Sequence, residues 1–308
     1  MSASGRGDVL ARGSLMSSSM TRRTALKRSL AAAPVVLSWR AWAAPGQDVN
    51  TALAELESRH GGRLGVAALD VRSGTRTERR ADERFAMCST FKLLAAALVL
   101  ARVDRGDERL DRRVVFAAND VVTYSPATEK RVGAPGMTVE ELCEALLTLS
   151  DNTAANLLLA SFGGPAALTA YVRSIGDAVT RLDRIEPEVN EVTPGDPRDT
   201  TTPAAMLENL RRLVLGDALS PASRSRLIAW LVANTTGKAR LRAGLPGSWR
   251  VGDRTGSGTH ATTNDVAVAW PPDRPPLLLS VYYSESSASA DQRNAVLADV
   301  ARLVAPTL

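Results

Sequence analysis

The chain has 308 residues, of which 44% are apolar and 23% are charged. This length and composition are typical of a soluble globular protein with one or two domains, and they exclude a disordered chain and an integral membrane protein. The formal charge of +5 does not indicate nucleic-acid binding, because seven of the 38 basic residues but only one of the 33 acidic residues lie in residues 1–43, which leaves the remainder close to neutral.

The N-terminal segment has the features of an export signal. Arg22 and Arg23 precede a short apolar run at residues 30–37, and residues 41–43 form a small-x-small cleavage pattern. Because these features stand in the order that a signal requires, we favour a cleaved signal over a disordered basic tail. The arginine pair resembles a twin-arginine signal, so we expect export to the periplasm and cleavage near Ala43. The apolar run is too short to span a bilayer, so we expect no membrane association after cleavage.

Hydrophobic periodicity and capping residues predict helices in the middle of the chain and strands near both ends. The predicted helices span residues 48–59, 91–103, 138–149 and 290–304, and two more begin at the prolines after Thr202 and Ser220. The predicted strands span residues 64–71, 76–80, 249–255, 264–270 and 277–283. Residues 184–200 are polar, contain three prolines and follow no period, which favours a functional loop.

This order of elements predicts an α/β two-lobed fold of the α+β type. One antiparallel sheet would be built from both chain termini and flanked by helices, with an all-helical lobe inserted between its strands. After the extension and signal of residues 1–43, residues 44–308 would form a single domain. Its α/β lobe would comprise about 44–84 and 232–308, and its helical lobe about 85–231.

Cysteine and histidine are scarce. Two cysteines, Cys88 and Cys143, exclude a disulfide-rich scaffold in a chain of this length, although a single disulfide stays open. Only His60 and His260 are present, and no C-x-x-C or H-x-x-x-H spacing occurs. The sequence therefore predicts neither a metal site nor a cofactor.

Ser89 and Lys92 stand three residues apart at the start of the predicted helix 91–103. Residues at this spacing share a helix face, so Lys92 would lie beside the Ser89 hydroxyl and, if burial lowers its pKa, would accept the proton of a serine nucleophile. The alternative is a capping serine beside a lysine that extends to solvent. An isolated S-x-x-K match favours that alternative.

Ser150, Asp151 and Asn152 form a second polar segment between two apolar runs. These residue types are common in helix-capping turns. As a catalytic segment, Ser150 would pass a proton to a leaving nitrogen and Asn152 would bind a substrate amide. Asp151 would then hold the turn in shape.

Glu186 and Asn190 lie four residues apart in the loop 184–200. Together they can hold one water molecule on which Glu186 would act as a general base. A solvated loop acid is the commoner case, and we assign Glu188 and Glu191 to it.

Arg254, Thr255 and Ser257 surround Gly256 at the end of a predicted strand. A cation with two hydroxyls, beside a glycine that permits close approach, suits an anionic substrate such as a carboxylate. Alone, this segment would be an ordinary glycine-rich turn.

Together, the four segments are far more specific than any one of them. The set S-x-x-K, S-D-N, E-x-x-x-N and R-T-G-S resembles the motifs of class A serine β-lactamases in content and order, over essentially the whole mature chain. The E-x-x-x-N element separates these hydrolases from penicillin-binding peptidases. Three further segments are similar to the family: Tyr124-Ser125-Pro126, Gly136-Met137-Thr138 and Asn234-Thr235-Thr236-Gly237.

The resemblance implies a monomeric, periplasmic enzyme that hydrolyses the β-lactam amide of penicillins and cephalosporins and confers antibiotic resistance. Ser89 would be acylated, with the backbone N–H groups of Ser89 and Ser257 as the oxyanion hole. Either Lys92 or Glu186, the latter through a water molecule, would activate Ser89. Ser150 would protonate the departing nitrogen, and Glu186 would drive deacylation.

The resemblance also implies a set of substrate-binding residues. Asn190 would place the hydrolytic water, Asn152 would bind the substrate amide and Tyr124 would line the cleft. The substrate carboxylate would be held by Arg254, Thr255, Ser257 and Arg240.

The sequence departs from the family pattern at three positions. Arg254 replaces the usual lysine; it preserves the charge but leaves open whether this position relays protons through Ser150. In relatives with a disulfide, the positions that pair with Cys88 and Cys143 correspond to Gly258 and Ala96. The resemblance therefore implies two free thiols.

Three other classes of protein compete with this interpretation. A penicillin-binding transpeptidase shares the serine and the lysine, but Glu186 argues against it. A Ser-His-Asp esterase needs a histidine with an acidic partner and usually a G-x-S-x-G turn, and no serine here has a glycine two residues before it. A non-catalytic exported binding protein would not bleach a chromogenic cephalosporin such as nitrocefin.

Overall fold

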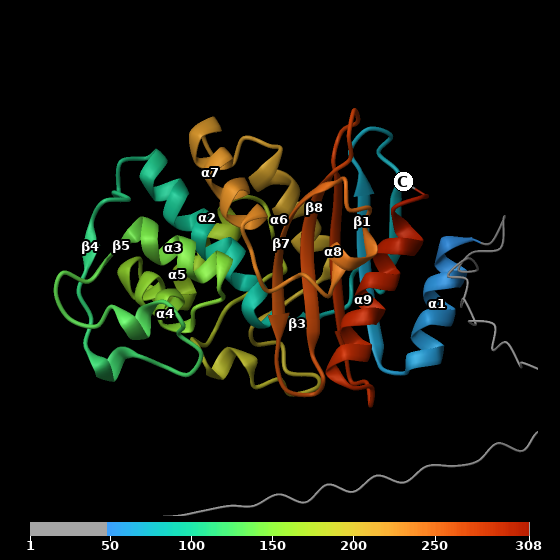
Figure 1. Ribbon diagram of the computed structural model, residues 1–308, viewed down its shortest axis with the longest axis horizontal. Helices are drawn as coiled ribbons and strands as arrows, with labels where there is room; N and C mark the ends of the chain where they lie inside the picture. Colours follow the sequence, from blue (N-terminus) through green and yellow to red (C-terminus); the bar gives the residue numbers. More distant parts are fainter. Residues whose placement is uncertain (1–47, 308) are drawn as a thin grey trace, which may run out of the picture. The chain divides into compact units, whose positions relative to one another are not determined.

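The computed structural model describes residues 48–307, so the predicted export signal and its cleavage near Ala43 lie outside the described residues. A five-stranded antiparallel sheet has the strand order β2-β1-β9-β8-β7 (Figure 1). Its strands come from both ends of the described chain, which confirms the predicted architecture. The strands are β1 (Arg63–Asp70), β2 (Arg76–Arg79), β7 (Arg250–Ser257), β8 (Thr263–Trp270) and β9 (Leu277–Ser284).

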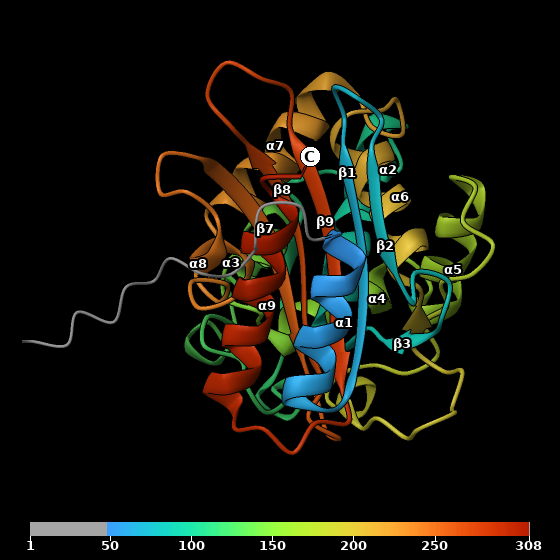
Figure 2. The same ribbon diagram turned by 90° about the vertical axis from the view of Figure 1, so that its right-hand side faces the viewer.

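One face of the sheet is covered by helices from the two ends of the described chain. Figure 2 shows α1 (Val49–His60) and α9 (Ala290–Val304) side by side on this face. Leu53 and Leu56 of α1 pack with Val296 and Val300 of α9 in a core that also contains the outward-facing side chains of β1, β8 and β9. The short helix α8 (Leu241–Gly244) packs against α9 and completes this layer.

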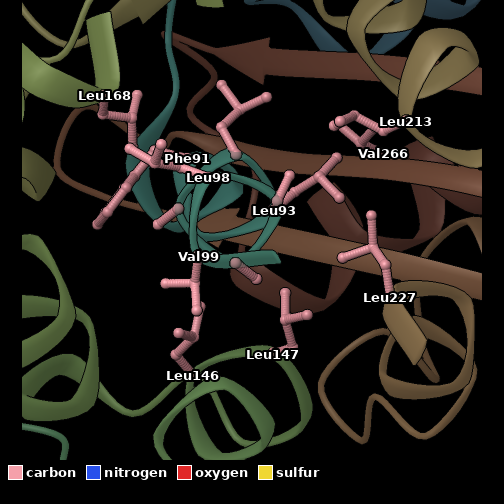
Figure 3. Close-up of a cluster of buried hydrophobic side chains, with 14 of the residues drawn as sticks. Phe91, Leu93, Leu98, Val99, Leu146, Leu147, Leu168, Leu213, Leu227 and Val266 are labelled. Carbon is pink, nitrogen blue, oxygen red and sulfur yellow. The ribbon is translucent and has the colours of Figure 1, made fainter. Parts of the chain in front are cut away.

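The other face of the sheet packs against the helical part of the chain. In Figure 3, the buried side chains of α2 are surrounded by leucines and valines from the neighbouring helices and from β8. Every residue from Phe91 to Ala101 is buried, as the continuous apolar run predicted. The helices of this part are α2 (Phe91–Asp104), α3 (Val139–Thr148), α4 (Asn152–Ser161), α5 (Gly164–Ser174), α6 (Pro203–Val214) and α7 (Pro221–Val232).

The capping residues identified in the sequence begin the predicted helices. Thr138 and Glu141 form a reciprocal capping box at the start of α3. Thr202 and Ser220 accept hydrogen bonds from Ala205 and Ser223, and each precedes a proline at the first helical position. These local signals explain why the predicted helix starts agree with the observed ones to within one or two residues.

No single described helix is long and apolar enough to cross a membrane; the bent pair α4 and α5 passes by length and composition only.

Two short strand pairs connect the helical part to the sheet and to its own loops. β3 (Phe85–Ala86) pairs with β6 (Thr200–Thr201), and β4 (Arg113–Val114) pairs with β5 (Met137–Thr138). The pair β3 and β6 closes the far end of the loop 184–200. Arg184 and Asp199, at the two ends of this loop, form an ion pair with an Nε–Oδ2 distance of 2.5 Å. Residues 184–200 therefore form a loop whose two ends are held together, as these contacts show. The loop contains one 3-10 turn, η4 (Glu188–Asn190).

Candidate active site

Ser89 lies in the 3-10 turn η1 (Cys88–Thr90), which leads directly into α2. The preceding residue Cys88 has a left-handed φ of 45°, a strained conformation for a non-glycine residue that the surrounding packing must hold. β7 approaches this turn so closely that a Cβ on Gly256 would lie 2.6 Å from the carbonyl oxygen of Met87. Glycine at position 256 therefore allows the sheet edge to meet the serine turn.

Lys92 lies in the first turn of α2 and is fully buried. Its Nζ donates to the carbonyl oxygen of Ser150 at 2.8 Å and to Oδ1 of Asn152 at 2.6 Å, and it forms an ion pair with Oε1 of Glu186 at 3.0 Å. Burial lowers the pKa of Lys92 to about 8, and the opposing charge of Glu186 limits this shift. The S-x-x-K spacing predicted this amine beside the Ser89 hydroxyl, but its hydrogen bonds go to Ser150 and Asn152.

Ser150, Asp151 and Asn152 form the turn between α3 and α4, and Ser150 has a left-handed φ of 63°. Asp151 is buried and caps α4 by accepting from the backbone N–H of Ala154. It also accepts from both the N–H and the hydroxyl of Thr128. Asp151 thus ties the turn to the neighbouring loop, as the sequence predicted, while the side chains on either side of it are directed at the site.

Glu186 is buried at the base of the loop 184–200. Its Oε1 accepts from the Ser89 hydroxyl at 3.2 Å, and its Oε2 accepts from the side-chain amide of Asn190. Glu188 and Glu191 are exposed and lie outside this arrangement, in line with their assignment as solvated acids. Of the three loop glutamates, Glu186 is therefore the one that reaches the serine.

Asn156 on α4 holds the backbone of Glu186 from both sides. Its side-chain nitrogen donates to the Glu186 carbonyl at 2.7 Å, and its oxygen accepts from the Glu186 N–H at 2.9 Å. Asn156 was not among the site residues predicted from the sequence. The signal was an asparagine within the apolar run of residues 154–160, where a polar side chain needs a partner.

Arg254 on β7 is fully buried and donates to Ser89 and Ser150. Its Nε donates to the carbonyl oxygen of Ser89 at 3.1 Å, and its Nη2 donates to the hydroxyl of Ser150 at 2.5 Å. Desolvation lowers its pKa to about 10, which still leaves the group protonated at neutral pH. The family resemblance implied that this side chain holds a substrate carboxylate, but the guanidinium is buried and its hydrogen bonds go to Ser89 and Ser150.

A cavity of about 550 Å³ opens beside Ser89, between the sheet edge and the helical part. Eight of the eleven residues singled out in the sequence line it: Ser89, Tyr124, Ser150, Asn152, Asn190, Arg240, Thr255 and Ser257. The other three, Lys92, Glu186 and Arg254, lie buried behind the lining. The side chain of Tyr124 is 58% exposed, which places it at the rim.

Hydroxyl and cationic groups gather at the β7 side of this cavity. The Thr236 hydroxyl lies 2.6 Å from that of Thr255, and Arg240 donates to the Ser257 hydroxyl at 2.7 Å. Asn294 on α9 accepts from Nε of Arg240 and orients it. Thr236 and Asn294 extend the set found from the sequence, where Thr236 was noted only as part of a segment.

The hydroxyls of the site form a directed chain of hydrogen bonds. Arg254 donates to Ser150, Ser150 donates to Ser89 with an Oγ–Oγ distance of 3.3 Å, and Ser89 donates to Glu186. A serine whose proton is directed at a buried carboxylate is an activated nucleophile. The hydroxyl of Ser150 stands where it can deliver a proton to an atom leaving from the Ser89 side.

Cys88 and Cys143 are both buried free thiols, as the family resemblance implied. Burial raises the pKa of each thiol. Neither is therefore a nucleophile at neutral pH.

Comparison with known proteins agrees with the geometry. The sequence matches the Beta-lactamase enzyme family over residues 48–308. Beta-lactamase CTX-M-8 of Citrobacter amalonaticus is 51% identical over 261 residues, which cover 85% of this chain and 89% of that protein. A solved structure of an ancestral class A β-lactamase is 66% identical and has a TM-score of 0.83. The match covers 85% of this chain and 100% of the chain in that structure. The chain belongs to the class A β-lactamases.

As a class A β-lactamase, the enzyme hydrolyses β-lactams with a serine nucleophile. Beta-lactamase OXY-2 of Klebsiella oxytoca is a further relative, 49% identical over 274 residues that cover 89% of this chain and 94% of that protein. The class A β-lactamase fold accounts for the five-stranded sheet with its helical lobe. Class A β-lactamases are secreted enzymes that give resistance to β-lactam antibiotics.

Proposed function

We propose that Glu186 is the general base for both halves of the β-lactamase reaction and that Ser89 is the residue acylated. The hydrogen bond from Ser89 to Oε1 of Glu186, at 3.2 Å, is the observation that carries this proposal. In acylation, the Ser89 oxygen attacks the lactam carbonyl while its proton moves toward Glu186. The tetrahedral oxyanion would be met by the backbone N–H groups of Ser89 and Ser257.

Ser150 completes the acylation step as the proton donor to the lactam nitrogen. Its hydroxyl receives hydrogen bonds from Lys92 at 3.3 Å and from Arg254 at 2.5 Å. Two cationic donors on one hydroxyl oxygen make its proton easier to release to the leaving nitrogen. The ring-opened product then remains esterified to Ser89. The proton that Glu186 took from Ser89 passes through Lys92, which contacts both groups, to Ser150, so Ser150 is protonated again and Glu186 is again a free carboxylate.

Deacylation uses the same carboxylate on a water molecule. Asn190 donates to Oε2 of Glu186 and offers its amide oxygen, which has no partner among the described residues. A buried polar oxygen without a partner beside a general base fits a position for the hydrolytic water. Attack by this water on the ester carbonyl would release the product and return the proton to Ser89.

Substrate binding falls to the residues that line the cavity. Asn152 would bind the side-chain amide of the substrate, and Tyr124 would cover it at the rim. Thr255, Ser257 and Arg240 would hold the substrate carboxylate, with Thr236 as a fourth partner through its hydrogen bond to Thr255. In this scheme Arg254 positions Ser150 and Ser89 and attracts the carboxylate by its charge alone.

The Glu186→Ala variant tests the proposal. Loss of this carboxylate removes the charge that raises the pKa of Lys92, so neutral Lys92 becomes available and slow acylation continues while deacylation stops. Mass spectrometry after incubation with a penicillin should show a covalent adduct on Ser89 with the mass of the whole drug. Glu188→Ala, an exposed carboxylate in the same loop, is the matched control and should turn over normally. Normal turnover by Glu186→Ala would show that the assigned base is wrong.

For export and assembly, our proposal is a twin-arginine route to the periplasm and a monomeric mature enzyme. Support for the route comes from Arg22 and Arg23 ahead of the apolar run at residues 30–37. Replacing both arginines with lysine should leave the enzyme in the cytoplasm, which cell fractionation would measure. Light scattering on the purified mature enzyme would measure its molecular mass.

A further inference from the structure

A second cavity, of about 120 Å³, lies beside the loop 184–200 and shares no lining residue with the catalytic cavity. A cavity needs a volume of roughly 10–15 Å³ to hold one water molecule, so this cavity accommodates a small polyatomic ligand. Residues 192–198 form one wall; the start of β1, the end of β9 and β3 form the others. Figure 2 shows the loop next to β3.

Four arginines line this cavity, against two acids. Three of the arginines are matched by carboxylates: Arg63 pairs with Glu83, Arg184 with Asp199 and Arg198 with Asp196. The fourth, Arg84, forms no ion pair among the described residues. The lining acids are Asp196 and Glu285, and the lining arginines are Arg63, Arg84, Arg184 and Arg198.

The unpaired guanidinium of Arg84 is held in place by one of its nitrogens only. Its Nη1 donates to the carbonyl oxygen of Val179 at 3.1 Å and to the hydroxyl of Thr200 at 2.9 Å. No described partner accepts from its Nε or Nη2. These two nitrogens form the side-on edge with parallel N–H groups that binds carboxylates and phosphates in bidentate fashion.

The neighbouring side chains keep the other charges of the cavity fixed. Arg63 lies over the ring of Phe85, with its guanidinium carbon 4.0 Å from the ring centroid. In the wall formed by residues 192–198, Pro194 and Gly195 form the centre of a tight turn, in which Asp196 N–H donates to the Thr193 carbonyl and Gly195 has a φ of 82°. A rigid wall and preoriented cations reduce the entropy lost when a ligand binds.

From this geometry we propose that the cavity is a binding site for a small multivalent oxyanion, such as inorganic phosphate, with Arg84 as its bidentate partner. Arg63 and Arg198 line the same cavity but are each paired with a carboxylate, so the unpaired guanidinium offered to the anion is that of Arg84. Because residues 192–198 continue directly from Glu186 and Asn190, the bound anion would tie the far half of the catalytic loop to β3. The site therefore stabilises the folded enzyme without touching the β-lactam.

Thermal unfolding with inorganic phosphate as the probe, against sodium chloride at equal ionic strength, tests the proposal. We expect phosphate to raise the Tm by about 2–5 °C at several times its Kd. The quantity compared is the phosphate-dependent shift within each variant, so a lower starting Tm does not obscure it. In Arg84→Gln and in Arg198→Gln the shift should fall to less than half.

Two controls separate this site from other sources of a phosphate effect. Arg109→Gln removes an exposed arginine that pairs with Asp111 two residues away, as Arg198 pairs with Asp196, and it should keep the full shift. Ser257→Ala tests phosphate bound in the catalytic cavity, and it too should keep the shift. A full shift in both Arg84→Gln and Arg198→Gln, or a shift lost only in Ser257→Ala, would overturn the proposal.

Discussion

The side chains of Arg254 and Ser150 are joined by a hydrogen bond of 2.5 Å from Nη2 to Oγ, where the buried guanidinium of Arg254 meets the lining of the catalytic cavity. The same guanidinium donates from Nε to the carbonyl oxygen of Ser89 at 3.1 Å. One side chain therefore holds both the turn that carries Ser89 and the Ser150 hydroxyl that faces it. A lysine ends in a single nitrogen and cannot present two separated donors in this fixed geometry.

This arrangement predicts unequal effects of two substitutions at position 254. Arg254→Lys keeps the charge and can keep one hydrogen bond to Ser150, so kcat/KM for nitrocefin should fall by less than about tenfold. Arg254→Gln removes the charge and most of the donors, and kcat/KM should fall by about 10²–10³-fold, the usual cost of losing one preorganised donor. Arg250→Lys, on the same strand but exposed, is the control. Near-parental activity in Arg254→Gln would contradict the assigned role.

Lys92 predicts the alkaline side of the pH profile. If Glu186 accepts the Ser89 proton, protonated Lys92 supports the reaction through its ion pair with Glu186 and its hydrogen bond to Ser150. The pKa of Lys92 is about 8, so the amine is almost fully protonated well below pH 8. At pH 9 only about one tenth of it is protonated.

The acylation rate should therefore decrease with a midpoint near pH 8. Stopped-flow measurement of acylation from pH 6 to pH 10 checks this, with Lys130→Met, an exposed lysine, as the control. A rate that increases through the same range would identify neutral Lys92 as the base.

The fold was largely predictable because each element carries its own local signal. The helix predicted at residues 290–304 has the limits observed for α9, a capping box marks the start of α3, and Thr-Pro and Ser-Pro pairs mark the starts of α6 and α7. The alternation of apolar residues and turn clusters placed β7, β8 and β9 to within two residues. These patterns depend only on neighbours in the sequence, so one chain is enough to detect them.

The direction of individual side chains was less predictable, because it depends on contacts between distant segments. Spacing placed Lys92 on the same helix face as Ser89, but the amine finds its partners on the turn after α3 and on the loop 184–200. Charge and position suggested that Arg254 faces the substrate, whereas burial directs it to the backbone of Ser89. Asn156 was missed because a single polar residue in an apolar run does not reveal which loop it holds.

Burial of the two cysteines leads to a prediction about the reactivity of their thiols. Both thiols are buried and their pKa values are raised by desolvation, so the folded enzyme should not react with a thiol reagent within minutes. After unfolding in guanidinium, both should react. Mass spectrometry of the denatured protein should give the same mass with and without reductant. A gain of about 2 Da on reduction would reveal a disulfide.

Asp151 predicts the largest loss of stability among the residues near the site. Its two oxygens accept four hydrogen bonds, from the N–H groups of Ala127, Thr128 and Ala154 and from the Thr128 hydroxyl, all between 2.8 and 2.9 Å. Asp151→Ala leaves these buried donors without partners, so the free energy of unfolding should fall by about 3–5 kcal/mol. Urea unfolding measured by tryptophan fluorescence gives this value directly.

A second substitution and a control separate the hydrogen bonds from the loss of side-chain volume. Asp151→Asn keeps one accepting oxygen and nearly the same shape, so it should lose about half as much stability as Asp151→Ala. Asp120→Ala removes a comparable aspartate that accepts from the backbone of an exposed 3-10 turn, and it should lose little. Because Asp151 fixes the turn that carries Ser150, kcat of Asp151→Ala should be lower than that of the parent enzyme even at temperatures well below the unfolding temperature of the variant. An equal loss of stability in Asp120→Ala and Asp151→Ala would show that burial of these hydrogen bonds is not what holds the turn.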